Sequence, residues 1–191
     1  IMKFPLILGV SARHLHLTRQ DMDTLFGVNS ELHTKKPIGQ PGQFAADEQI
    51  TLITAKSKMT LRVIGPLRSY TQVELSLTDA RSLGLTPPIR NSGDIENSAG
   101  ATIVGPKGEV ILKQGIIVAA RHIHLNPETA NKYALHDGDI VDIVTPGERS
   151  LTLHNVLVRA GATHADECHL DTDEANACGL ASDAMIEIVT K

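Results

Sequence analysis

The sequence contains two histidine pairs of the form His-x-His, at His14/His16 and at His122/His124. In a β-strand, side chains two residues apart point to the same face, so each pair would project both imidazoles to one side. Two imidazoles on one side can share a metal ion, and histidine is the commonest metal ligand in proteins. A single His-x-His pair is more often only the polar face of a strand, because two ligands do not complete a site.

The two pairs belong to a longer internal repeat. Residues 8–17 (LGVSARHLHL) match residues 116–125 (IIVAARHIHL), and residues 73–85 match residues 168–180 in the same order along the chain. The second match aligns Glu74 with His169 and so adds a third candidate ligand to each half. A polar pattern that is present in both copies of a duplication favours metal binding over two unrelated polar surfaces.

The repeat therefore predicts two sets of three ligands. They are His14/His16/Glu74 and His122/His124/His169. Three protein ligands with one open position are the arrangement of a catalytic zinc site. Imidazole and carboxylate donors fit zinc or another borderline first-row metal, and the ligand types alone do not choose among these metals.

An arginine lies close to the first set in the sequence. Arg68 ends the turn Gly65-Pro-Leu-Arg68, six residues before Glu74. A guanidinium at that place suits a phosphate or a carboxylate, although a turn arginine is often simply solvated. The chain has no Walker loop, no GxGxxG after a strand and no GxSxG elbow, which argues against the common nucleotide-binding and serine-hydrolase folds.

The elements that must position these residues are short. Each His-x-His block is predicted to be a strand that runs into a short helix, with Thr18 and Asn126 as N-caps and with Gly27 and Gly138 ending the helices. Further strands are expected at residues 49–54, 59–64, 72–77, 101–104, 110–113, 139–144, 150–158 and 184–189, and residues 87–100 are expected to form a long loop. Many short strands separated by Gly/Pro turns favour barrels over a parallel sheet.

The predicted fold class is mainly β, with two similar β-barrels capped by short α-helices and derived from an internal duplication. The chain of 191 residues is long enough for two small domains. The first barrel is expected at residues 13–114. The second is expected at residues 115–191, completed by an N-terminal strand at residues 3–12.

Composition limits the classes of partner. With 41% hydrophobic and 21% charged residues, the chain is predicted to be a soluble globular protein, and its apolar runs are too short to span a membrane. A net charge of −4, with three Phe, two Tyr and no Trp, argues against a nucleic-acid surface. Two cysteines and no recognisable signal peptide favour the reducing cytoplasm. Neither cysteine has a neighbouring base of the kind that a nucleophile needs.

Several motifs together resemble one family, the PduL-type phosphotransacylases, also called phosphate propanoyltransferases. The motifs are Val10–Leu17, Gly39–Phe44, Gly65–Arg68 with Gln72–Leu75, Ala120–Leu125 and His169–Asn176. The resemblance covers nearly the whole chain. It implies a two-barrel, dinuclear zinc enzyme that exchanges coenzyme A for phosphate on short acyl groups, and we expect the phosphate to attack the thioester directly.

The resemblance also implies roles for individual residues. The two sets of three ligands would hold two zinc ions per chain, and Arg68 is similar to the family's phosphate-binding arginine. Ser11, Lys36, Arg62 and Asn176 are expected to contact coenzyme A, and Ser92 is expected to contact phosphate.

The expected partners are small molecules, acyl-CoA and phosphate, with no nucleic acid and no membrane; a homo-oligomer is left open. Family members of bacterial microcompartments carry an extra N-terminal encapsulation helix, whereas the barrel here is predicted to begin at Lys3. A cytoplasmic location is therefore expected, and a microcompartment lumen is left open.

Two other functions remain open from the residues alone. A non-enzymatic metal-binding barrel would explain the histidines but gives Arg68 no task. A zinc-dependent thioesterase or hydrolase would use the same ligands with water as the nucleophile. A zinc hydrolase of the amidohydrolase type is disfavoured, because its TIM barrel needs about 250 residues.

Overall fold

The computed structural model describes residues 1–191, which form fourteen strands and four helices. The chain divides into two compact units. The first unit comprises Arg13–Ile38 and Gly42–Ala119, and the second comprises Ile1–Ala12, Gly39–Pro41 and Ala120–Lys191. Residues 115–119, which the sequence analysis assigned to the second barrel, lie in the first unit.

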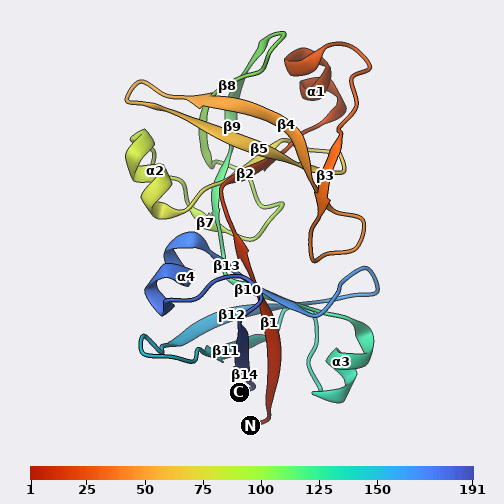
Figure 1. Ribbon diagram of the computed structural model, residues 1–191, viewed down its shortest axis with the longest axis vertical. Helices are drawn as coiled ribbons and strands as arrows, with labels where there is room; N and C mark the ends of the chain where they lie inside the picture. Colours follow the sequence, from red (N-terminus) through yellow and green to blue (C-terminus); the bar gives the residue numbers. More distant parts are fainter. The chain divides into compact units, whose positions relative to one another are not determined.

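The first unit contains eight strands and two helices (Figure 1). They are β2 (His14–His16), α1 (Arg19–Phe26), β3 (Thr34–Pro37), β4 (Phe44–Ile53), β5 (Lys58–Gly65), β6 (Gln72–Glu74), α2 (Leu77–Leu83), β7 (Ile89–Arg90), β8 (Ala99–Val104) and β9 (Glu109–Ala119). Six of the strands pair in a closed ring, in the order β4-β5-β2-β6-β9-β8 and back to β4. β3 pairs with β4 and β7 pairs with β9 outside this ring.

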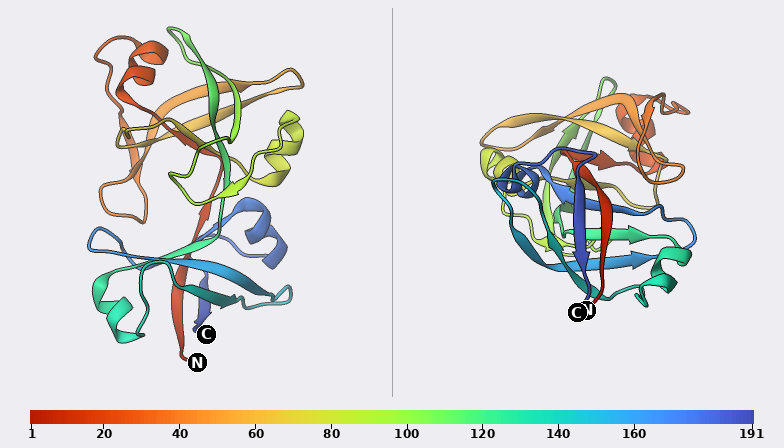
Figure 2. Two further views of the ribbon diagram at one scale, coloured as in Figure 1. Left: turned by 180° about the vertical axis from the view of Figure 1, so that it is seen from behind. Right: turned by 60° about the horizontal axis from the view of Figure 1, so that its bottom comes forward.

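The second unit is also a closed six-stranded barrel, and its strands can be followed from two further sides in Figure 2. Its elements are β1 (Lys3–Ser11), β10 (His122–Leu125), α3 (Pro127–Lys132), β11 (Ile140–Val144), β12 (Thr152–Ala160), β13 (Glu167–Asp171), α4 (Thr172–Cys178) and β14 (Met185–Val189). The order around the barrel is β1-β13-β10-β12-β11-β14. The predicted mainly β fold with two similar barrels and short helices is thus confirmed.

The two barrels have the same pattern of strand pairing. In the first, β2 runs parallel to β5 and antiparallel to β6, and β6 runs parallel to β9. In the second, β10 runs parallel to β12 and antiparallel to β13, and β13 runs parallel to β1. β9 and β1 are therefore counterparts. Each precedes a His-x-His strand in the sequence but belongs to the unit that does not contain that strand.

Each barrel has its own hydrophobic core. Leu15 and Leu17, which alternate with the first histidine pair, are fully buried in one core, and Ile123 and Leu125 are fully buried in the other. Burying such a side chain contributes about 1.5–3 kcal/mol. The alternation therefore holds the intervening histidines on the opposite face of each strand.

The helices begin where the sequence predicted. Thr18 and Asn126 are N-caps whose side chains accept from the backbone N–H of Asp21 and Thr129. Gly27 ends α1 with a positive φ of 108°, as expected. None of the four helices has the length and apolar character needed to cross a bilayer.

Two local expectations were wrong. α3 ends at Lys132 and not at Gly138, because Ala134 adopts a positive φ of 50° and the backbone N–H groups of Ala134 and Leu135 cap the helix on the carbonyls of Asn131 and Ala130. The loop expected at residues 87–100 includes the short strand β7, which pairs with β9 through Ile89 and Arg90. The first difference arises from a local helix cap, and the second from pairing with a strand that is distant in the sequence.

Candidate metal centres

The first unit brings together His14, His16 and Glu74. The two histidines lie on β2, and Glu74 lies on β6 directly opposite His14. One ligand atom from each residue lies within 4.8 Å of the others. Glu74 Oε2 is 3.6 Å from His14 Nε2, and Glu74 Oε1 is 3.9 Å from His16 Nε2. These distances are too long for hydrogen bonds. They are close to the separation of about 3.3 Å between two ligands of one tetrahedral zinc ion.

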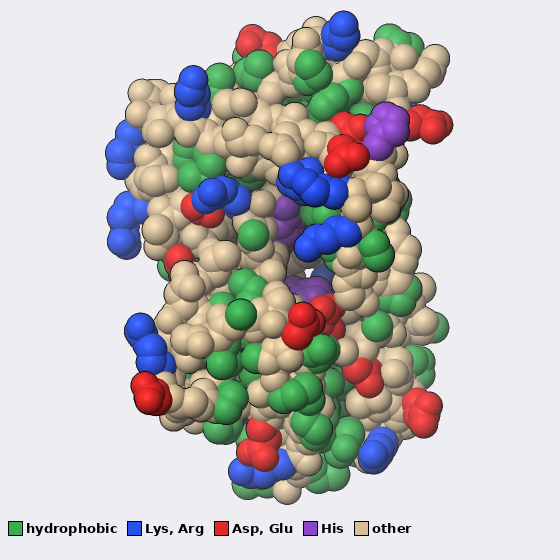
Figure 3. Space-filling model, viewed as in Figure 1, with side chains coloured by type: hydrophobic (Ala, Val, Ile, Leu, Met, Phe, Trp, Pro, Cys, Tyr) green, Lys and Arg blue, Asp and Glu red, His purple; other side chains and the backbone are tan.

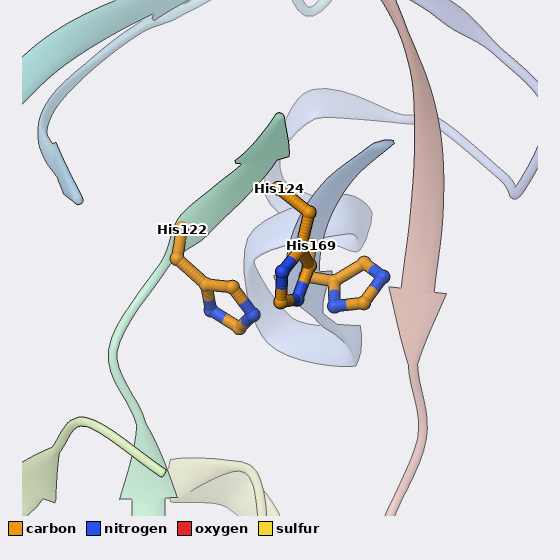
Figure 4. A group of neighbouring side chains, drawn as sticks. All are labelled: His122, His124 and His169. Carbon is orange, nitrogen blue, oxygen red and sulfur yellow. The ribbon is translucent and has the colours of Figure 1, made fainter. Parts of the chain in front are cut away.

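The second unit brings together His122, His124 and His169 in the equivalent way. His122 and His124 lie on β10, and His169 lies on β13 opposite His122. The three ring centroids are 4.8–5.0 Å apart, and one nitrogen from each ring lies within 4.8 Å of the others. Figure 4 shows the rings gathered at one place from the two strands. Both predicted sets of three residues are thus clustered in space.

Hydrogen bonds to the backbone set the tautomers of two of these rings. His16 Nδ1 lies 3.1 Å from the carbonyl oxygen of Ile64, and His122 Nδ1 lies 2.9 Å from that of Ala120. A carbonyl only accepts, so Nδ1 must carry the proton in both rings. A ring protonated on Nδ1 carries its lone pair on Nε2, and this neutral tautomer is the form that binds a metal through Nε2.

Burial keeps two of the candidate ligand histidines neutral. Desolvation, followed by the charge of His14, lowers the pKa of His16 to about 3, and desolvation with the charges of neighbouring histidines lowers the pKa of His124 to about 2. The Nδ1 atom of His124 is buried and has no hydrogen-bond partner. A buried nitrogen without a partner is destabilising unless a further group satisfies it. The donor atoms of both clusters therefore fit a bound cation.

These pKa values lead to a test on the metal-free protein. As the pH falls from 7 to 5, His16 and His124 should stay neutral, while His33, whose pKa is raised by its hydrogen bond and ion pair with Glu48, should become protonated first. NMR titration of the histidine rings measures this order directly. The unfolded chain binds protons at His16 and His124 more strongly than the folded chain does. Protonation of either residue in the unfolded chain therefore lowers the free energy of unfolding as the pH falls below 6.5. A midpoint above pH 6 for either ring would contradict the prediction.

Gln72 supports the first cluster and was not identified from the sequence. It is fully buried on β6, two residues before Glu74. Its Nε2 donates to Glu74 Oε1 at 2.7 Å and to Ser92 Oγ at 2.9 Å, and its Oε1 accepts from the backbone N–H of Gly93 at 2.7 Å. The repeat contained a signal for this residue, because it aligns Gln72 with Glu167, but the two side chains differ in type.

Glu167 supports the second cluster and was likewise not identified. Its Oε2 accepts from His169 Nε2 at 2.8 Å and from Gln40 Nε2 at 2.9 Å. Burial acts to raise the pKa of Glu167, but the hydrogen bonds from His169 and Gln40 outweigh it, so the pKa is lowered. Glu167 is therefore an ionised acceptor beside the third histidine.

Arg68 and Ser92 lie beside the first cluster. The backbone N–H of Arg68 donates to the carbonyl of Leu17, which fixes the turn against the end of the β2 segment. Arg68 Nη1 donates to Ser92 Oγ at 3.3 Å. The positive charge of Arg68 is among the causes that lower the pKa of His16. These two predicted phosphate-binding residues are thus close to each other and to the cluster.

The four residues expected to contact coenzyme A are divided between the units. Lys36 is exposed on β3, and Arg62 lies on β5 beside His14, with Nη1 donating to the carbonyls of Ala46 and Asp47. In the second unit, Ser11 ends β1 next to β13, and Asn176 is exposed on α4. The structure does not gather these four side chains into one cluster within either unit.

The arginine before each histidine pair has the same role in both units. Arg13 Nη1 pairs with Asp79 Oδ1 at 2.6 Å, and Arg121 Nε pairs with Glu174 Oε1 at 2.7 Å. Asp79 and Glu174 lie in the first turns of α2 and α4, the helices that follow the third ligand. Each ion pair therefore links the strand of the histidine pair to the helix after the third ligand.

The units differ in charge. The first contains twelve Lys and Arg against ten Asp and Glu, whereas the second contains six against twelve. In Figure 3 many of the Lys and Arg side chains on the visible face lie over the elements of the first unit. The first unit is therefore the more favourable one for an anionic ligand.

Comparison with known proteins gives a consistent result. A family model described as phosphate propanoyltransferase matches residues 7–181. The chain is 50%, 48% and 47% identical to proteins named phosphate propanoyltransferase from Rhodopseudomonas palustris, Rhodobacter capsulatus and Thermotoga maritima, respectively. These matches cover 98%, 94% and 96% of this chain and 84%, 84% and 89% of the relatives.

Proposed function

The chain belongs to the phosphate propanoyltransferase family, and from this premise we propose that it moves a short acyl group between coenzyme A and inorganic phosphate. The reaction is acyl-CoA plus phosphate giving acyl phosphate plus coenzyme A, and it is reversible. The observation that carries the proposal is the first cluster, where three ligand side chains lie beside an arginine and a serine suited to an oxyanion.

We propose zinc as the metal of both clusters. His14, His16 and Glu74 would hold one ion, and His122, His124 and His169 would hold the other. When bound, zinc supplies a Lewis acid for the thioester carbonyl oxygen and a ligand position that suits a thiolate sulfur. The neutral, buried forms of His16 and His124 support this assignment, because they need not lose a proton before they bind a metal.

Arg68 and Ser92 are proposed to bind the phosphate nucleophile. Arg68 uses one of its five N–H groups on Ser92 and keeps the others for a phosphate oxygen. Ser92 Oγ accepts from both Arg68 and Gln72, so its two lone pairs are used and its hydroxyl hydrogen remains to be donated. Arg68 and Ser92 therefore offer only hydrogen-bond donors to a bound molecule, as an oxyanion requires.

Ser11, Lys36, Arg62 and Asn176 are proposed to contact coenzyme A. Lys36 is exposed, and Arg62 retains N–H groups beyond the one that binds two backbone carbonyls. Both cations lie in the more positively charged unit and suit the phosphates of coenzyme A. Ser11 and Asn176 offer neutral polar groups from the second unit.

We propose direct attack without a covalent acyl-enzyme. A phosphate oxygen forms a bond to the carbonyl carbon, the carbon–sulfur bond breaks, and the thiolate leaves with the electron pair. Cys168 and Cys178 are both buried, and burial raises the pKa of the Cys168 thiol well above its usual value. Neither cysteine is therefore suited to act as a nucleophile.

The experiment is to measure coenzyme A release from acetyl-, propionyl- and butyryl-CoA with and without phosphate. Release should depend on phosphate and give acyl phosphate, and arsenate should replace phosphate because it has the same shape and charge. Equal release without phosphate would identify a thioesterase instead. No release in either condition, from a protein with its metal bound, would favour a metal-binding barrel without this activity.

A further inference from the structure

Each strand that carries a third ligand also carries a polar residue two positions earlier on the same face. This residue is Gln72 on β6 and Glu167 on β13. The two occupy the same place in their barrels. The register pairs His14 with Glu74 and His16 with Gln72, and it pairs His122 with His169 and His124 with Glu167.

Both residues make a hydrogen bond to the third ligand of their cluster, but in opposite directions. Gln72 Nε2 donates to the carboxylate of Glu74 at 2.7 Å. Glu167 Oε2 accepts from His169 Nε2 at 2.8 Å. Where the ligand is a carboxylate, its partner is a donor, and where the ligand is an imidazole, its partner is an acceptor.

The direction of each bond determines which ligand atoms remain for a metal. A carboxylate oxygen accepts, so the contact of 2.8 Å between Glu167 Oε2 and His169 Nε2 places the proton of His169 on Nε2 and leaves Nδ1 as the nitrogen that can bind a metal. The amide of Gln72 donates to Oε1 of Glu74, and Oε2 is the oxygen that lies 3.6 Å from His14 Nε2. A residue that hydrogen-bonds to a metal ligand orients that ligand and raises its basicity.

We propose that Gln72 and Glu167 are positioning residues matched to the chemistry of the third ligand, a donor where that ligand is the carboxylate of Glu74 and an acceptor where it is the imidazole of His169. The inference rests on the metal centres of the proposed function. This matching explains why the two repeats differ both at residues 72 and 167 and at residues 74 and 169. A glutamate at residue 72 beside Glu74, or at residue 169 beside Glu167, would place two acceptors against each other.

Other contacts hold Glu167 in a single place. Gln40 donates to its Oε2 and is itself bound to the backbone N–H and carbonyl of Ala165. Gly9 and Gly39 leave no room beside the carboxylate, because a Cβ at Gly9 would lie 2.5 Å from Glu167 Oε1. Both bonds are made to Oε2, so the amide oxygen of a glutamine in its place could still accept from Gln40 and His169, but it could not accept from Gln40 and donate to residue 169 at once.

The test compares single variants of the second unit with a double-mutant cycle in the first, all on the full chain. Zinc binding is measured by competition with a chromophoric chelator, and cobalt absorption spectra report the ligand geometry. Glu167→Ala should weaken one of the two zinc-binding steps by about 10–100-fold. His169→Glu should weaken the same step by more, since two carboxylates would then face each other. Glu167→Gln should bind zinc about as tightly as the wild type, because an amide oxygen in the place of Oε2 still accepts from Gln40 and His169.

The first unit provides the double-mutant cycle. Gln72→Glu should weaken the other zinc-binding step, because two carboxylates would face each other, and Gln72→Glu with Glu74→His should recover at least about tenfold of that loss and give a tetrahedral cobalt spectrum. Circular dichroism checks that each variant is folded, and this cycle stands if His169→Glu does not fold. A purely structural role predicts additive losses, so a double variant no better than Gln72→Glu would overturn the pairing. Wild-type protein that binds no zinc would overturn the proposed centres as well.

Discussion

Replacing His124 by alanine should abolish one of the two zinc-binding steps and lower turnover by more than about 100-fold. Removing a residue that only hydrogen-bonds to a metal ligand already lowers metal affinity or activity by about 10–100-fold. His124 is itself a proposed ligand, so we expect a larger loss. His122 and His169 would be left as a two-ligand site, which does not hold zinc well. Elemental analysis should find about two zinc ions per wild-type chain and about one in the variant.

The matched control is His136→Ala, because the His136 side chain is 84% exposed and lies outside both clusters. This variant should keep both zinc ions and full activity. A thermal midpoint for each variant separates loss of metal from loss of the fold. If His124→Ala retained two zinc ions, the assignment of the second cluster would be wrong. If it simply unfolded the second unit, the metal would have a structural role there.

Replacing Arg68 by alanine should lower phosphate-dependent turnover by on the order of 100-fold or more while both zinc ions stay bound. The guanidinium is not a metal ligand, and its proposed task is to hold the phosphate and stabilise charge in the transition state. Arg68→Lys should rescue poorly, because an ammonium lacks the fork that binds two oxygens. The readouts are the phosphate dependence of coenzyme A release and the zinc content.

Arg19→Ala is the control for the loss of one positive charge from the first unit. Arg19 forms an exposed ion pair with Asp23 on α1, and such pairs contribute little to stability. This variant should therefore keep normal turnover. Normal activity of Arg68→Ala would refute the phosphate role, whereas loss of zinc from it would mean that Arg68 supports the metal cluster instead.

Much of this protein follows from local sequence patterns. Alternation in a strand is a property of three successive residues, so His14 and His16 had to share a face once Leu15 was buried. The duplication then identified Glu74 and His169 as candidate ligands from the sequence alone, because it aligns them at one position of the repeat. The N-caps Thr18 and Asn126 were equally local, since each bonds only to the backbone of its own helix.

Other features depend on which distant segments meet, and local pattern carries no information about that. β9 extends to Ala119 in the first unit before the chain enters the second. Gln72 and Glu167 reach their hydrogen-bond partners through strand register and, for Glu167, through Gln40, which is 127 residues away. An isolated glutamine or glutamate has no distinctive spacing. Its function arises only when folding buries it against a ligand, where every donor must find an acceptor.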